Sequence, residues 1–224
     1  MTFLEAVRTR AGASGRRLAF PESADARTLA AVARIARLRI ADPVLVLDPA
    51  APETHAAAKA TGVPVVDPAA DPRVDQLASD LLAARGRKGL TGARAAELAR
   101  TPLFFADALV HWGEVDGCVA GAAHATADVL RAALWLVGLA PGVRTVSSAF
   151  YMVTAPFRGG TDVEVLTFTD CAVVPYPTPS QLADIAVAAA VDRRRIVGDE
   201  PRVAMLSFST RGSGAGASVD AVRD

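Results

Sequence analysis

The four residues 44–47, V-L-V-L, constrain the fold more than any other part of the sequence. No polar residue alternates with the apolar ones, so a strand here must be buried on both faces, which is typical of a parallel sheet covered by helices. The preceding segment 25–38 has the pattern of an amphipathic helix, with apolar side chains at Leu29, Val32, Ala33 and Ala36. A helix that leads into a doubly buried strand favours an α/β layer architecture.

The same alternation continues along the chain. We expect further strands at 17–20, 63–66 and 115–120, and helices at 53–60, 75–84, 102–112 and 128–139. Thr91 is the expected N-cap of another helix, which contains residues 95–98. A Pro-Gly pair at 141–142 predicts a boundary between a first α/β domain, residues 1–142, and a second one, residues 143–224.

In the second domain, strand-like runs occupy 146–153, 166–170 and 203–206. A helix over 180–191 is expected to be capped by Ser180, and a final helix by Ser218. Largely parallel sheets are expected in both domains.

Composition excludes several classes of partner. The 24 basic and 24 acidic residues among 224 balance, so the bulk charge attracts neither nucleic acid nor an anionic membrane. No apolar run approaches the roughly 20 residues needed to cross a bilayer, and no signal peptide is recognisable. Two cysteines, Cys118 and Cys171, are too few for a disulfide framework, which indicates a cytoplasmic protein.

The segment 121–131, G-A-A-H-A-T-A-D-V-L-R, follows the apolar run 115–120 and predicts an anion-binding turn. Small residues from Gly121 onward let backbone amides approach a ligand closely, and Thr126 is the expected cap of the next helix. Arg131 lies about one turn into that helix, where its guanidinium can bind phosphate oxygens. His124 is expected to make a structural hydrogen bond in the turn and so to support the site.

A second segment has the same character. The run 203–206 opens into S-F-S-T-R-G-S at 207–213. We expect its hydrogen-bond donors to a phosphate to be Ser207, Ser209, Thr210, Gly212 and Ser213. Two such turns predict one phosphorylated ligand, or two.

Other candidate groups have simpler explanations. Cys118 lies within an apolar strand, so we interpret it as a packing residue and not as a nucleophile. Glu114 and Asp116 have the spacing of a metal pair, but neither a histidine nor a third carboxylate accompanies them, and we expect no metal site.

Taken together, these motifs resemble the phosphate acetyltransferase family. The matching segments run in order along the chain. They are T-F-L-E at 2–5, F-P-E-S at 20–23, I-A-D-P-V-L-V-L at 40–47, R-G-R-K-G at 85–89, G-E-V-D-G at 113–117, the 121–131 block, A-F at 149–150 and the 207–213 loop.

The resemblance implies two α/β domains with an interdomain cleft, as in isocitrate and isopropylmalate dehydrogenases, and reversible acetyl transfer between CoA and inorganic phosphate. It implies acetyl-CoA, phosphate and acetyl phosphate as substrates, no metal cofactor and a homodimer at full length. Arg85 and Arg131 correspond to arginines near the family's substrate. Family members continue past the 207–213 loop to an N-D-L-S-R-G motif that contributes the base and serine. The chain therefore resembles an N-terminal portion, with an incomplete second domain that ends at Asp224.

Two alternatives remain open. One is a non-catalytic binding domain for acyl-CoA or acyl phosphate, similar to the regulatory domain that follows the catalytic part of some malic enzymes. The other is a phosphate butyryltransferase, although members of that group depart more from the 121–131 block.

Overall fold

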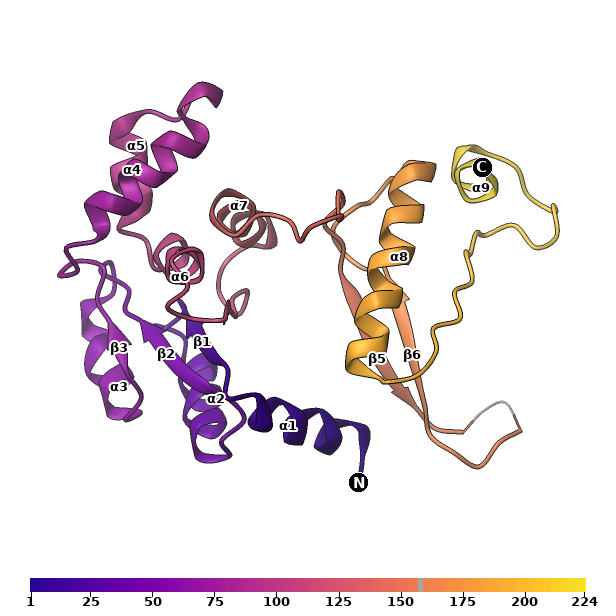
Figure 1. The fold of residues 1–224 in the computed structure, drawn as a ribbon, viewed down its shortest axis with the longest axis horizontal. Helices are drawn as coiled ribbons and strands as arrows, with labels where there is room; N and C mark the ends of the chain where they lie inside the picture. Colours follow the sequence, from indigo (N-terminus) through magenta and orange to yellow (C-terminus); the bar gives the residue numbers. More distant parts are fainter. Residues whose placement is uncertain (157–158) are drawn as a thin grey trace. The chain divides into compact units, whose positions relative to one another are not determined.

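The chain forms two compact units in a computed structural model that describes residues 1–156 and 159–224 (Figure 1). One unit comprises Leu4–Gly138, and the other comprises Met1–Phe3 with Leu139–Asp224. This division lies close to the predicted boundary at residue 142.

A four-stranded parallel sheet forms the centre of the Leu4–Gly138 unit. Its strands are β1 (Arg17–Phe20), β2 (Asp42–Val46), β3 (Val65–Val66) and β4 (Gly117–Cys118), in the spatial order β3-β2-β1-β4. The chain passes from β1 to β2 and β3 on one side, and then returns to place β4 on the other side of β1. The parallel strands predicted from the sequence are confirmed for this unit.

Helices surround this sheet. They are α1 (Phe3–Ser14), α2 (Ala26–Arg37), η1 (Pro52–Thr54), α3 (His55–Ala60), α4 (Val74–Arg85), η2 (Gly86–Lys88), α5 (Gly92–Ala99), α6 (Pro102–His111) and α7 (Thr126–Leu136).

The strand β2 is buried on both faces, as its composition predicts. Val44 and Val46 pack into a core formed with α4, α5, α6 and α7, whereas Leu45 and Leu47 pack into a second core with residues of α2 and α3. All four side chains are at most 1% exposed. Each contributes about 1.5–3 kcal/mol through burial, so this strand holds the two helical layers to the sheet.

Helix N-caps test the sequence interpretation at single residues. Asp25 caps α2 and Thr91 caps α5, both through side-chain oxygens that accept backbone N–H groups. Three other expected caps are wrong. Thr126 is the first residue of α7, and the cap position is Ala125. Ser180 lies inside α8, where Thr178 forms a capping box with Gln181. The helix α9 begins after Gly216 instead of Ser218.

The second unit contains β5 (Ala149–Thr154), β6 (Glu164–Thr169), α8 (Pro179–Ile196) and α9 (Ala217–Arg223). The strands β5 and β6 pair antiparallel, so the expected parallel arrangement is wrong for this pair. Residues 203–206 form no strand, contrary to prediction, and their side chains are exposed. They border a groove of about 770 Å³ that is also lined by β6, α8 and Val222.

Among the described residues, no helix combines the length and apolar character that a bilayer crossing requires.

Candidate functional site

The candidate site lies at the carboxyl edge of the parallel sheet, between β1 and β4. These strands are neighbours in the sheet, but the chain leaves β1 toward β2 and reaches β4 only after α6. Ligands of open α/β sheets bind at such a reversal of strand order, outside the carboxyl ends of the strands. A depression of about 280 Å³ is present here. It is lined by Phe20, Glu22, Arg27, Thr28, Ala31, Val119, Ala120 and Ala122.

The turn after β4 holds an anion, and that anion is the side chain of Glu22. Four consecutive backbone amides, from residues 121 to 124, donate to the Glu22 carboxylate at 2.8–3.0 Å. Gly121 makes the turn possible because its φ of 110° lies in the left-handed region, which favours glycine. The amides that the sequence assigns to a phosphate ligand are therefore already occupied by an internal carboxylate.

Glu22 is buried and ionised. Its side chain is only 3% exposed, and burial alone would raise its pKa. Hydrogen bonds from the Ala123, His124 and Ala122 amides and from the His124 ring outweigh burial and lower the pKa of Glu22 to about 2. The carboxylate thus carries its charge throughout the physiological range.

His124 contacts the same carboxylate through its ring. Its Nδ1 lies 3.0 Å from Glu22 Oε1, and 31% of the His124 side chain is exposed. An ionised carboxylate only accepts hydrogen bonds, so Nδ1 carries the proton that it donates to Glu22. The structural hydrogen bond expected between His124 and the backbone is thus made with a side chain instead: the ring bonds the Glu22 carboxylate, to which the His124 amide also donates.

Arg27 closes the other side of the depression. Its guanidinium donates to both carboxylate oxygens of Asp25 and, at 2.6 Å, to the Ala122 carbonyl. This contact ties the start of α2 to the turn after β4. Neither Glu22 nor Arg27 was among the residues that the sequence assigned to the site.

Arg131 lies on the exposed part of α7 and pairs with Asp128, three residues earlier on the same helix. An exposed pair of this kind contributes little stability and exchanges readily with another anion. Thr126 occupies the first position of α7, whose N-terminus has no side-chain cap in the described part of the chain. Thr126 and Arg131 are therefore accessible to a ligand.

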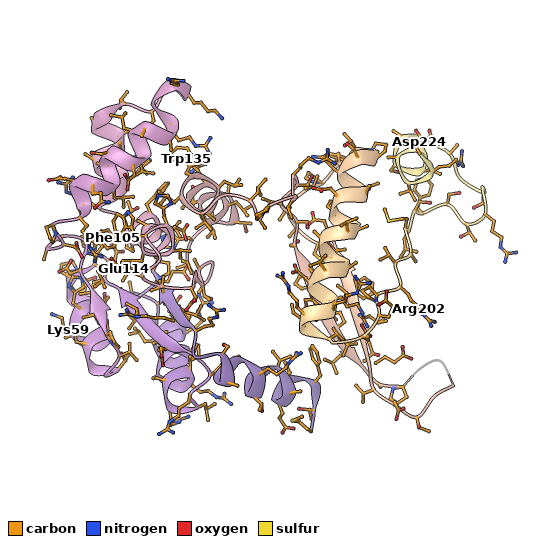
Figure 2. The ribbon with its side chains drawn as sticks, in the orientation of Figure 1. Lys59, Phe105, Glu114, Trp135, Arg202 and Asp224 are labelled. Atoms are coloured by element: carbon orange, nitrogen blue, oxygen red, sulfur yellow. The ribbon has the colours of Figure 1, made fainter. Side chains whose placement is uncertain are left out.

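Arg85 reaches α7 from the end of α4. Its Nη2 donates to the Leu134 carbonyl at 3.2 Å, and its Cζ lies 5.3 Å from the centre of the Trp135 ring. Figure 2 labels Trp135 on α7. Because Trp135 is four residues after Arg131, the two lie on the same face of the helix. The structure thus brings the guanidinium of Arg85 to the helical face that carries Arg131.

The serine-rich loop belongs to the other unit and is described separately. It is organised by its own side chains: Ser207 Oγ accepts from the Ser209 amide, Ser213 Oγ from the Thr210 amide, and Ser209 Oγ from the Gly214 amide. Gly212 adopts a φ of 82°, which forms the tight turn. The loop is structured, but it does not follow a buried strand as the sequence predicts.

The carboxylates considered as a metal pair have other partners. Glu114 pairs with Arg73, and Asp116 pairs with Arg16 and accepts the Arg17 amide at 2.8 Å. No cluster of three or more His, Cys, Asp or Glu suited to a metal ion occurs in residues 1–156 and 159–224. Cys118 is bound into the core beside Asp107, and burial raises the pKa of its thiol.

Comparisons with known proteins agree with the motifs. The model of the family described as phosphate acetyl/butaryl transferase matches residues 2–224. The phosphate acetyltransferase of Treponema pallidum (strain Nichols) is 42% identical over 96% of this chain and 65% of its own length. That of Thermoanaerobacterium thermosaccharolyticum is 39% identical over 100% of this chain and 68% of its own length.

Solved structures give the same result. A phosphotransacetylase from Streptococcus pyogenes superposes with a TM-score of 0.81 at 30% identity, over 98% of this chain and 67% of the other. The EutD phosphotransacetylase from Staphylococcus aureus gives a TM-score of 0.78 at 29% identity, over 99% of this chain and 65% of the other. The chain thus spans about two thirds of the length of these four proteins.

Proposed function

Because this chain belongs to the phosphate acetyl/butaryl transferase family, we propose that the protein is a phosphate acetyltransferase, which converts acetyl-CoA and phosphate into CoA and acetyl phosphate. The observation that carries the proposal is the identity of 36–42% to relatives named phosphate acetyltransferase, over nearly the whole of this chain. The same relatives favour acetyl transfer over the butyryl and non-catalytic alternatives.

The proposed reaction is a direct acyl transfer. In the direction of acetyl-CoA synthesis, the CoA thiolate attacks the carbonyl carbon of acetyl phosphate, the bond between that carbon and the phosphate oxygen breaks, and inorganic phosphate leaves. The reaction requires cations that hold the phosphoryl group in line and donors that stabilise the developing oxyanion. We assign the first task to Arg85 and Arg131.

Two structural features support this assignment. Arg85, from the end of α4, is held against Leu134 and Trp135 of α7, the helix that carries Arg131. The exposed pair of Arg131 with Asp128 leaves its guanidinium free to exchange partners. Ser207, Ser209, Thr210, Gly212 and Ser213 are the proposed donors from the other unit.

A thiol-release assay tests the proposal. Its subjects are the 224-residue chain and a chimera in which the unmatched distal part of the Treponema pallidum relative follows it. We expect the chimera to release CoA from acetyl-CoA only when phosphate is present, and the shorter chain to be much slower. A chimera that releases CoA at the same rate without phosphate, or not at all while the parent relative is active, would contradict the proposal. Light scattering of the chimera measures the proposed homodimer.

A further inference from the structure

Glu22 and His124 form a carboxylate–imidazole pair across about 100 positions of sequence. The carboxylate also accepts the amides of residues 121–124, so five donors fix its position. The bond to Nδ1 directs that N–H at Glu22 and leaves Nε2 as the ring nitrogen that faces a ligand. Nε2 accepts in the neutral ring and donates only when the ring is protonated. Within the described residues, no protein group contacts Nε2 as a hydrogen-bond partner.

We infer that the protonated His124 ring donates from Nε2 to a phosphoryl oxygen of the substrate and that Glu22 is the positioning residue that orients the ring for this contact. The inference rests on the proposed acetyltransferase function and adds to it a phosphoryl-binding residue, His124, with a second residue, Glu22, that acts only through the first.

Because Glu22 occupies the backbone amides of the turn after β4, a phosphoryl group that binds here needs other hydrogen-bond donors. The amides of residues 121–124 donate to Glu22 and are not free for a ligand. Other polar groups next to the turn are the Nε2 of His124, the hydroxyl of Thr126 and the first backbone N–H groups of α7, which has no side-chain cap within the described residues. A protonated imidazole between the Glu22 carboxylate and a phosphoryl oxygen makes charge-assisted hydrogen bonds to both.

The charged neighbours favour an anion at this position. Glu22 stays ionised, and its carboxylate is directed at five hydrogen-bond donors. Arg27 lines the depression and bonds Asp25 as well as Ala122, and Arg131 pairs with Asp128 farther along α7. Asp107 and Cys118 lie on the core side, where Glu22 adds to the raised thiol pKa of Cys118. The segments that adjoin the turn thus supply two guanidinium side chains beside the ring, and the aspartates that pair with them are Asp25 and Asp128.

Imidazole nitrogen resonances of the 224-residue chain test the inference directly. The chain has three histidines, so the spectrum is simple, and His124→Asn identifies the signals of His124. We expect the Nδ1-protonated tautomer for neutral His124 and a different tautomer mixture in Glu22→Gln. Inorganic phosphate and acetyl phosphate should each shift the His124 Nε2 resonance, whereas acetate should not.

Matched variants separate binding from folding. His124→Asn retains a side-chain donor for Glu22 but has nothing at the Nε2 position, so it should fold normally and bind phosphate at least tenfold more weakly. His111→Asn, at the exposed end of α6, should bind phosphate like the wild type. If Glu22→Gln does not fold, His124→Asn still decides the question.

Three results would overturn the inference: an Nε2-protonated tautomer in the wild type, a response to acetate equal to that to phosphate, or unchanged phosphate binding in a folded His124→Asn variant. These outcomes differ from failure of the proposed function. If phosphate binds at His124 but the chimera does not transfer acetyl groups, the binding inference stands and the proposed activity is wrong. If the chimera is active but phosphate does not bind at His124, only the binding inference is wrong.

Discussion

The guanidinium of Arg85 lies over the indole of Trp135, with 5.3 Å between Cζ and the ring centre. The same side chain donates to the Leu134 carbonyl, so Arg85 joins the end of α4 to α7. We expect Arg85→Lys to lower the free energy of unfolding by about 1 kcal/mol, because lysine lacks the planar group that stacks and donates at once. Urea denaturation measures the change. Arg87→Lys, in the same basic turn but exposed, should be neutral.

Substitution of Arg131 distinguishes a role in substrate binding from a role in stability. Its pair with Asp128 is exposed and lies within one helix, so Arg131→Ala should change stability by less than about 0.5 kcal/mol. If it binds the phosphoryl group, the same change should reduce kcat/KM for acetyl phosphate by at least about 100-fold in the chimera. Arg94→Ala provides the control, because Arg94 makes an equivalent exposed pair with Glu97. Equal effects of the two substitutions would remove Arg131 from the site.

The position of the candidate site was predictable from the sequence, but its internal partner was not. The segment 121–131 predicts an anion-binding turn because glycine and small residues follow an apolar strand, and the structure places an anion there. That anion is Glu22, about 100 residues earlier in the chain. Local patterns carry no information about which distant carboxylate reaches a turn. Only the pairing of β1 with β4 brings the two segments together.

Glu22 also predicts a specific dependence of stability on pH. Its folded pKa of about 2 lies below the value of 4.5 expected when unfolded, so its stabilisation is present above about pH 4.5 and is lost as the pH falls toward 2. At pH 7 we expect Glu22→Gln to lower the free energy of unfolding by about 2–3 kcal/mol. The difference between wild type and variant should shrink in the acid range. A difference that stays constant from pH 7 to pH 2.5 would show that charge is not the cause.

Asp107 predicts the opposite dependence. It lies on α6, is 4% exposed and has one carboxylate oxygen without a partner among the described residues. Burial raises its pKa to about 6, partly offset by a hydrogen bond with Cys118. The native state therefore holds this proton more tightly than the unfolded chain, and stability falls as the pH rises from about 4 to 6. Asp107→Asn should raise the free energy of unfolding at pH 7.5 by about 2 kcal/mol and have little effect at pH 4. A variant less stable than wild type at pH 7.5 would contradict this.

The fold was predictable where a segment meets its partners inside one unit. The run 44–47 is a buried strand because β1 and β3 pair with it and helices cover both faces. The run 203–206 has a similar composition, yet it pairs with no strand in the described part of the chain, and Leu206 is 76% exposed. An apolar composition indicates that a segment is suited to burial, but it does not show whether another strand lies beside it. A β-strand forms only where its backbone N–H and C=O groups pair with those of a neighbouring strand.

The second unit should consequently expose apolar surface in solution. Val203, Leu206 and Phe208 are 56–76% exposed, and the groove of about 770 Å³ between β6 and α8 lies beside residues 203–206. We expect the 224-residue chain to enhance the fluorescence of an apolar dye such as ANS while its near-ultraviolet circular dichroism shows fixed packing. Leu206→Ser should weaken dye binding and leave the melting temperature unchanged, because an exposed side chain contributes little to stability.

Val44→Ala is the opposite case: it should leave dye binding by the native chain unchanged and lower the free energy of unfolding by about 2 kcal/mol, because Val44 is 1% exposed. A dye-silent chain, or equal effects of the two substitutions on the melting temperature, would contradict the exposed position of this segment.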